Sequence, residues 1–153
     1  MGEEHRSAAR NCTGELLEKL YKNVGMESEA LTGMLAKVKN VKLSEELTDQ
    51  LGTYGKFSND IKAELSSVTN DTPKVGAIGR MTAKLGVEMS SLTDSSDKHI
   101  AQMAIESTTM SITDNIRLVR DYENSNCRES ALKLAKNVVS FQENAAERMK
   151  SFL

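Results

Sequence analysis

The chain has 153 residues, of which 39% are hydrophobic and 27% charged, and its formal net charge is −2. A chain this apolar and this balanced in charge is not disordered, and it lacks the basic excess of a nucleic-acid-binding domain. Its apolar runs fall short of the roughly 18 residues that a membrane-spanning helix needs. We therefore expect one domain over residues 1–153 that binds neither nucleic acid nor membrane.

The first residues and the cysteines bear on the compartment. Residues 1–10 are polar and charged and lack the apolar core of a signal peptide, so we expect a cytoplasmic protein with a flexible segment over 1–12. Cys12 and Cys127 lie far apart in the sequence and outside any Cys-x-x-Cys pattern, which predicts free thiols in a reducing compartment. The two histidines, His5 and His99, are too few for a histidine-based metal site.

Apolar residues recur at helical spacing along nearly the whole chain, and no segment alternates with the period of a strand. The first predicted helix runs from about Thr13, a candidate N-cap, to Val38. The second runs from about Ser44 to Val68. The residues of their apolar stripes are Leu17, Leu20, Val24, Leu31, Met34, Leu35, Val38, Leu47, Leu51, Tyr54, Ile61, Leu65 and Val68.

A region rich in helix breakers follows the second helix, and we assign residues 69–96 to a crossover. Within it, Met81, Leu85 and Met89 share one face, which predicts a short extra helix. The third long helix is predicted from about Asp97 to Tyr122 and the fourth from about Arg128 to Phe152, with a turn over 124–126.

The lengths of these elements predict an all-α bundle. Four helices of about 25 residues are each about 38 Å long and suit lateral packing. Short connections make the first and second helices one antiparallel hairpin, and the third and fourth another. Two hairpins joined by a long crossover form the ferritin-like type of four-helix bundle. The alternative is an up-down-up-down bundle with a fifth helix laid across it.

The third helix is apolar over much of its circumference, because Met103, Met110 and Leu118 extend the stripe of Ile105, Ile112 and their neighbours. Such a helix needs a second partner, which is either the crossover or another subunit. His99, Met103, Glu106 and Met110 also lie along one side and resemble a soft-metal patch. Methionines in this setting are more typical of core packing, which we favour.

Polar residues interrupt the apolar stripes near the middle of each helix. These are Glu27 in the first helix, Gln50 and Tyr54 in the second, Thr108 in the third and Gln142 in the fourth. In a bundle of two hairpins these positions share one height, which predicts a polar layer at the centre. A carboxylate buried there must be paired, hydrogen-bonded or neutral, and the Tyr54 hydroxyl with the Gln50 and Gln142 amides would be its partners.

This pattern resembles the ferritin-like superfamily over residues 13–152. The segments DSSDKHIAQM and FQENAAERMKSFL, which cover 94–103 and 141–153, also look like those of small uncharacterised bacterial helical proteins. The superfamily holds two metal ions with a Glu from each of two helices and a Glu-x-x-His motif from each of the other two.

The resemblance places Glu27 at the first-helix Glu of that site and Thr108 at the inward position of the third helix. Gln50 and Thr53 stand where the second helix would carry Glu and His, and Gln142 and Ala145 stand there in the fourth. One carboxylate of four and no histidine remain, so we expect a degenerate centre without metal or cofactor. A weak site, if one existed, would use Glu27, Gln50, Tyr54 and Gln142.

No phosphate-binding loop, Ser-His-Asp set or Cys-His pair appears in the sequence, so we expect no enzyme. The favoured hypothesis is a non-enzymatic bundle that self-associates or binds a protein partner. The first alternative is a divergent metal-binding or redox-stress protein with a weak site around Glu27, and the second is a small-molecule binder that uses the polar layer. Glycines inside predicted helices, such as Gly52 and Gly55, suggest close helix–helix approach.

Overall fold

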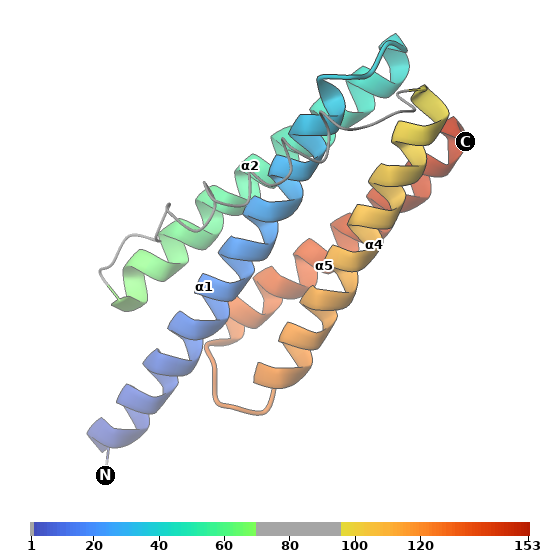
Figure 1. Ribbon diagram of the computed structural model, residues 1–153. Helices are drawn as coiled ribbons and strands as arrows, with labels where there is room; N and C mark the ends of the chain where they lie inside the picture. Colours follow the sequence, from blue (N-terminus) through green and yellow to red (C-terminus); the bar gives the residue numbers. More distant parts are fainter. Residues whose placement is uncertain (1, 70–95) are drawn as a thin grey trace.

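The computed structural model describes the backbone of residues 2–69 and 96–153 and the side chains of 12–68 and 96–153. Four α-helices lie side by side along one axis: α1 (Gly2–Leu35), α2 (Val41–Thr69), α4 (Asp97–Tyr122) and α5 (Glu129–Met149), followed by a 3-10 turn, Lys150–Phe152 (Figure 1). No strand occurs in these described residues, which confirms the all-α prediction. No helix among them has the length and hydropathy to cross a membrane.

Contacts between the hairpins fix the directions of α1 and α4. The Asn23 Nδ2 group donates to Asn115 Oδ1 at 2.9 Å, and Lys19 Nζ donates to the Tyr122 hydroxyl at 2.8 Å. Residues nearer the start of α1 therefore contact residues nearer the end of α4. The two helices run antiparallel.

Contacts between α2 and α5 show the same relation. Arg148 Nε pairs with Glu46 Oε1 at 2.7 Å near one end of the bundle, and Arg128 Nη1 pairs with Glu64 Oε1 at 3.4 Å near the other. Because α1 is antiparallel to both α2 and α4, α2 and α4 run in the same direction (Figure 1). The short extra helix predicted in the crossover lies outside the described residues.

Polar side chains set the starts of α2 and α4. Asn40 Oδ1 accepts from the Leu43 backbone N–H at 3.0 Å, so α2 begins at Val41 rather than at the predicted Ser44. Ser96 Oγ accepts from the backbone N–H of the third helical residue, and the predicted span of α4 is confirmed. The Asp97 carboxylate also accepts from the backbone N–H groups of residues 39 and 40, which fastens α4 to the α1–α2 loop.

The start of α1 differs from the prediction. The helix begins at Gly2, so Thr13 lies inside it and is not an N-cap, while the flexibility of residues 1–12 stays a prediction. Thr13 Oγ1 instead accepts from the Arg128 backbone N–H at 2.8 Å. The residues before Thr13 are mostly polar, so apolar periodicity does not indicate a helix there.

The prediction of free thiols is wrong. Cys12 of α1 forms a disulfide with Cys127 in the loop before α5, with their Cα atoms 5.3 Å apart. Antiparallel packing of α1 and α4 brings the two cysteines to the same end of the bundle, which spacing along the chain does not reveal. In the chain-entropy model a disulfide that closes a loop of this size stabilises a fold by about 5 kcal/mol.

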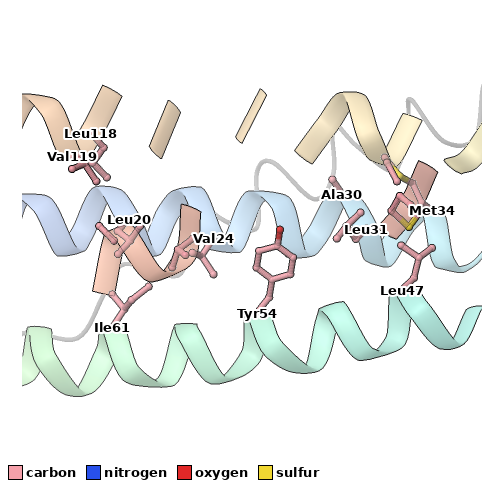
Figure 2. Packing of buried hydrophobic residues seen from close by; sticks show 14 of the residues in the cluster. Leu20, Val24, Ala30, Leu31, Met34, Leu47, Tyr54, Ile61, Leu118 and Val119 are labelled. Atoms are coloured by element: carbon pink, nitrogen blue, oxygen red, sulfur yellow. The ribbon is translucent and has the colours of Figure 1, made fainter. Parts of the chain in front are cut away.

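The predicted stripes of α1 and α2 form the core. Figure 2 shows Leu20, Val24 and Leu31 of α1 facing Leu47, Tyr54 and Ile61 of α2, with Leu118 and Val119 of α4 nearby. The Tyr54 ring packs edge-on against Phe141 of α5, with ring centroids 5.1 Å apart. The buried residues of α4 and α5 include many small side chains, which let these helices approach closely: Ala101, Ala104, Ala131, Ala135 and Ala145.

The inward face of α4 is rotated relative to the predicted stripe. Its buried line passes through Thr108, Ser111 and Asn115, whereas Ile112 and Ile116 are only half-buried. Polar partners in the other helices hold the polar line inside, so the aliphatic residues are displaced to one flank of the helix.

Close helix approach does not explain two of the glycines. A Cβ atom at Gly52 or Gly55 of α2 would meet nothing within 4 Å, and both positions are exposed. We therefore expect Gly52→Ala to raise the free energy of unfolding by about 1 kcal/mol, because alanine loses less backbone entropy in a helix. Urea denaturation measures the change. The exposed Ala63 of the same helix supplies the reverse control, since Ala63→Gly should destabilise by a similar amount. A loss of stability in Gly52→Ala would contradict the open space around this position.

Candidate functional site

The five polar residues predicted at the centre are all buried. Gln142 of α5, with 0% of its surface exposed, lies at the junction of the helices. Its Nε2 group donates to Ser111 Oγ at 2.8 Å and to the Tyr54 hydroxyl at 3.2 Å, and its Oε1 atom accepts from Asn115 Nδ2 at 2.9 Å. Three of the four hydrogen-bonding positions of this amide are thus filled by α2 and α4.

Asn115 extends the same network to α1, because its Oδ1 atom accepts from Asn23 Nδ2. The network therefore contains side chains from all four helices. Sequence reasoning found Tyr54 and Gln142 but missed Asn23, Ser111 and Asn115. Thr108, Ser111 and Asn115 follow one another at helical spacing on α4, and this polar line was the available signal.

Glu27 of α1 occupies a separate position beside the network. Its two carboxyl oxygens accept from the hydroxyls of Ser107 and Thr108, at 2.7 Å and 2.9 Å. No cation pairs with it among the described residues. Burial raises the pKa of the Glu27 carboxyl, and the two hydroxyl donors oppose this effect only in part. Ionisation of this buried carboxyl is therefore less favourable than ionisation of a carboxyl in water.

Gln50 is buried but does not reach Glu27, contrary to the prediction that its amide supplies a partner. Its Nε2 group donates to Glu46 Oε1 at 2.9 Å, and the same oxygen accepts from Arg148 Nε. The Gln50 Oε1 atom is buried and has no hydrogen-bond partner in the described part of the chain. Gln50 belongs to a contact between α2 and α5 nearer the end of the bundle.

Tyr54 is held as a neutral phenol. Burial and, to a smaller extent, the negative charge of Glu27 raise the pKa of its hydroxyl far above the ordinary value, and the bond from Gln142 opposes this only weakly. Its hydroxyl oxygen already accepts from Gln142. It is therefore not poised to act as a phenolate ligand or a proton donor near neutral pH.

The described residues do not fit the two-metal centre that the ferritin-like resemblance implies. Glu27 supplies one carboxylate, and both its oxygens are occupied by hydroxyl donors. The Gln142 carbonyl oxygen is directed to Asn115. No group of three or more His, Cys, Asp or Glu side chains that could hold a metal occurs in the part of the chain that the structure describes. Neutral amides and hydroxyls do not offset the charge of two divalent ions.

The soft-metal alternative on α4 also lacks a converging ligand set. Met110 is 70% exposed, while Met103 is half-buried against the core. Glu106 is exposed and accepts from Gln102 Nε2 at 3.1 Å. The core-packing prediction therefore holds for Met103, whereas the exposure of Met110 contradicts it for that residue.

A shallow groove of about 360 Å³ runs between α1 and α4. Met26 and Leu118 line it together with Asn23, whose amide leads into the central network. Charged side chains of both signs complete its lining: Lys19, Lys22, Asp114, Arg117 and Asp121. Of the residues of the central network, only Asn23 lines this groove, whereas Tyr54, Ser111 and Gln142 do not.

Comparisons with known protein families, with curated proteins and with solved structures find no match to this chain. The ferritin-like resemblance therefore stays a prediction that rests on topology and on the polar positions.

The raised pKa of Glu27 predicts a pH dependence of stability. The folded state binds this proton more tightly than the unfolded state, so stability falls as pH rises from 4.5, the ordinary value, through the raised folded pKa. Glu27→Gln removes the titrating group but keeps the shape and hydrogen-bonding capacity. We expect this variant to be more stable than the parent at neutral pH and to lose the corresponding slope. Urea denaturation between pH 4 and 8 tests this, with Glu18→Gln, an exposed position of the same helix, as the control. Parallel pH profiles for the parent and Glu27→Gln would contradict it.

Replacing the Gln142 amide with an apolar side chain is expected to lower the free energy of unfolding substantially. Gln142→Leu would leave Asn115, Ser111 and Tyr54 without their shared partner. Each buried polar group left unsatisfied costs about 1–3 kcal/mol, so we expect a loss of about 3 kcal/mol or more. Denaturant titration measures the loss, and Asn144→Leu on the exposed side of α5 should change stability by less than about 0.5 kcal/mol. Equal effects of the two substitutions would show that the network does not stabilise the bundle.

Proposed function

We propose that this chain is a non-enzymatic bundle of the ferritin-like type, in which the polar centre fixes the register of the helices and one outer face joins two copies of the chain. The observation that supports this proposal most is the position of Ile112 and Ile116. These aliphatic residues of α4 lie to one side of its buried face and are only half-buried.

The helix directions support the ferritin-like part of the proposal. In an up-down-up-down bundle the second and third long helices would be antiparallel. Here α2 and α4 run in the same direction, as two hairpins joined by a long crossover require (Figure 1). This topology combined with a centre that lacks the metal ligands is what the sequence resemblance implies.

The hydrogen bonds of Gln142 support a structural role for the centre. Its amide contacts α2 and α4 at once, and Asn115 carries the network on to α1. A slip of one helix by a turn would separate these groups and leave them buried without partners. Buried polar groups specify register in other helical assemblies. The same network occupies three of the four hydrogen-bonding positions of the Gln142 amide, which leaves little capacity for the metal-binding and small-molecule alternatives there.

The position of the isoleucines supports self-association. Leu118 and its neighbours face the groove with α1, and a helical wheel places Ile105, Ile112 and Ile116 on the opposite flank of the inward line. Half-buried aliphatic residues at spacings of seven and four form a continuous apolar stripe. With 20 basic and 22 acidic residues the chain carries little net charge to repel a second copy. A two-fold arrangement is the commonest form of such pairing.

The disulfide weighs against the cytoplasmic expectation. Disulfides persist in oxidising compartments, and those of cytosolic proteins are usually transient. The bond between Cys12 and Cys127 therefore favours an oxidising compartment, or a cytoplasmic protein in which the bond forms and breaks reversibly.

Light scattering coupled to gel filtration tests the proposed self-association. We expect the parent chain to have twice its 16.8 kDa mass at micromolar concentration, and Ile112→Glu to be a monomer, because a buried charge at the centre of the stripe is costly. Met110→Glu is the matched control, since Met110 is 70% exposed on another side of the same helix. A monomeric parent chain, or dissociation by Met110→Glu but not by Ile112→Glu, would contradict the proposed face. Circular dichroism verifies that each variant is folded.

A further inference from the structure

We propose that the Cys12–Cys127 bond is a site of reversible thiol–disulfide exchange, at which a dithiol reductant opens one end of the bundle while the rest of the fold stays closed. The inference concerns the end of the bundle where α1 meets the loop between α4 and α5, and it is independent of the proposed function.

The disulfide lies at the edge of the core, against which Cys127 packs. Both Cys12 and Cys127 are half-buried. In the loop and the first turn of α5, residues 123–130, every other side chain is exposed. Because the loop buries little apolar surface, hydrophobic packing contributes little to its attachment. Among the side chains that the structure describes, the disulfide is thus the main covalent or apolar contact between this loop and α1.

Within the described ranges 12–68 and 96–153, the loop also makes polar contacts. The Arg128 backbone N–H donates to Thr13 Oγ1 at 2.8 Å. The Arg128 guanidinium contacts Ser67 Oγ at 2.8 Å and Glu64 Oε1 at 3.4 Å, and Ser130 Oγ also contacts Glu64. Most of these side chains are exposed to solvent, where ion pairs and hydrogen bonds contribute only weakly to stability. They do not hold the loop closed once the disulfide is broken.

The body of the bundle has its own ties. Leu16, Leu17 and Leu20 of α1 lie within a few turns of Cys12 and are fully buried. Further along α1, Asn23 and Glu27 are bound to α4. Buried apolar surface and a closed polar network do not depend on the disulfide, so breaking it releases the loop and the adjoining turn of α1 and leaves the centre intact.

The exchange balances in two steps. A thiolate of the dithiol attacks one sulfur of the Cys12–Cys127 pair, the S–S bond breaks, and the other cysteine leaves as a thiolate that takes up a proton. The second thiol of the reductant, as its thiolate, then resolves the mixed disulfide. Two electrons and two protons pass from the dithiol to the pair of cysteines, and the reductant becomes a disulfide.

The test uses the oxidised full chain and dithiothreitol without denaturant. Alkylation with a maleimide followed by mass measurement reports the free thiols, and hydrogen exchange reports local opening. We expect both cysteines to be alkylated after reduction, and exchange of the amides of 124–130 to rise by about tenfold or more. The amides of 108–119 and 138–145 should change by less than about twofold.

Two variants sharpen the result. The double variant Cys12→Ser/Cys127→Ser should reproduce the exchange pattern of the reduced chain. Thr13→Val removes the neighbouring hydrogen bond but keeps the disulfide, so the oxidised form of this variant should keep the slow exchange of 124–130. The proposal is overturned if the folded chain resists the dithiol, if reduction or the double variant speeds exchange at every position, if reduction changes nothing, or if oxidised Thr13→Val already exchanges like the reduced chain.

Discussion

The structure depends on one amide, that of Gln142, where four helices meet. Its hydrogen bonds reach Tyr54 on α2 and both Ser111 and Asn115 on α4, and Asn115 carries the network to Asn23 on α1. A buried amide is stabilised only when its partners are in place, and its loss leaves several unsatisfied groups together. The network therefore couples the positions of all four helices, which separate apolar contacts along their length would not do.

Glu27 is buried near the same height and has no ion-pair partner among the described residues. Desolvation raises the pKa of its carboxyl, whereas the hydroxyls of Ser107 and Thr108 lower it, and desolvation has the larger effect. Tyr54 is driven toward its neutral form by burial and by the Glu27 charge. Burial thus makes ionisation of both groups less favourable. A centre with one carboxyl among amides and hydroxyls offers little compensation for the charge of a divalent ion.

Apolar periodicity predicted the helices well wherever one side of a helix is buried, and the capping residues near Asp97 located α4 to the residue. Interruptions of the stripes also identified Glu27 and Gln142 as buried polar groups. The partners of these groups could not be found in this way, because they lie on other helices and their pairing depends on the relative heights of the elements. The disulfide was missed for the same reason. The disulfide lies beyond the Lys19–Tyr122 and Asn23–Asn115 contacts, at the end of the bundle where α1 approaches the loop after α4. This proximity is known only once the helices are placed.

Polar contacts and one disulfide join the helices at three heights along the bundle. At one end the Asp97 carboxylate accepts from the backbone N–H groups of residues 39 and 40, at the middle the Gln142 amide joins the helices, and at the other end Cys12 is bonded to Cys127. Burial of apolar side chains is non-directional, so it stabilises a bundle without choosing one register over its neighbours. The directional contacts at three heights make that choice. The middle contact is buried, whereas the contacts at both ends are exposed or partly buried, so the surroundings reach the register contacts from the ends of the bundle.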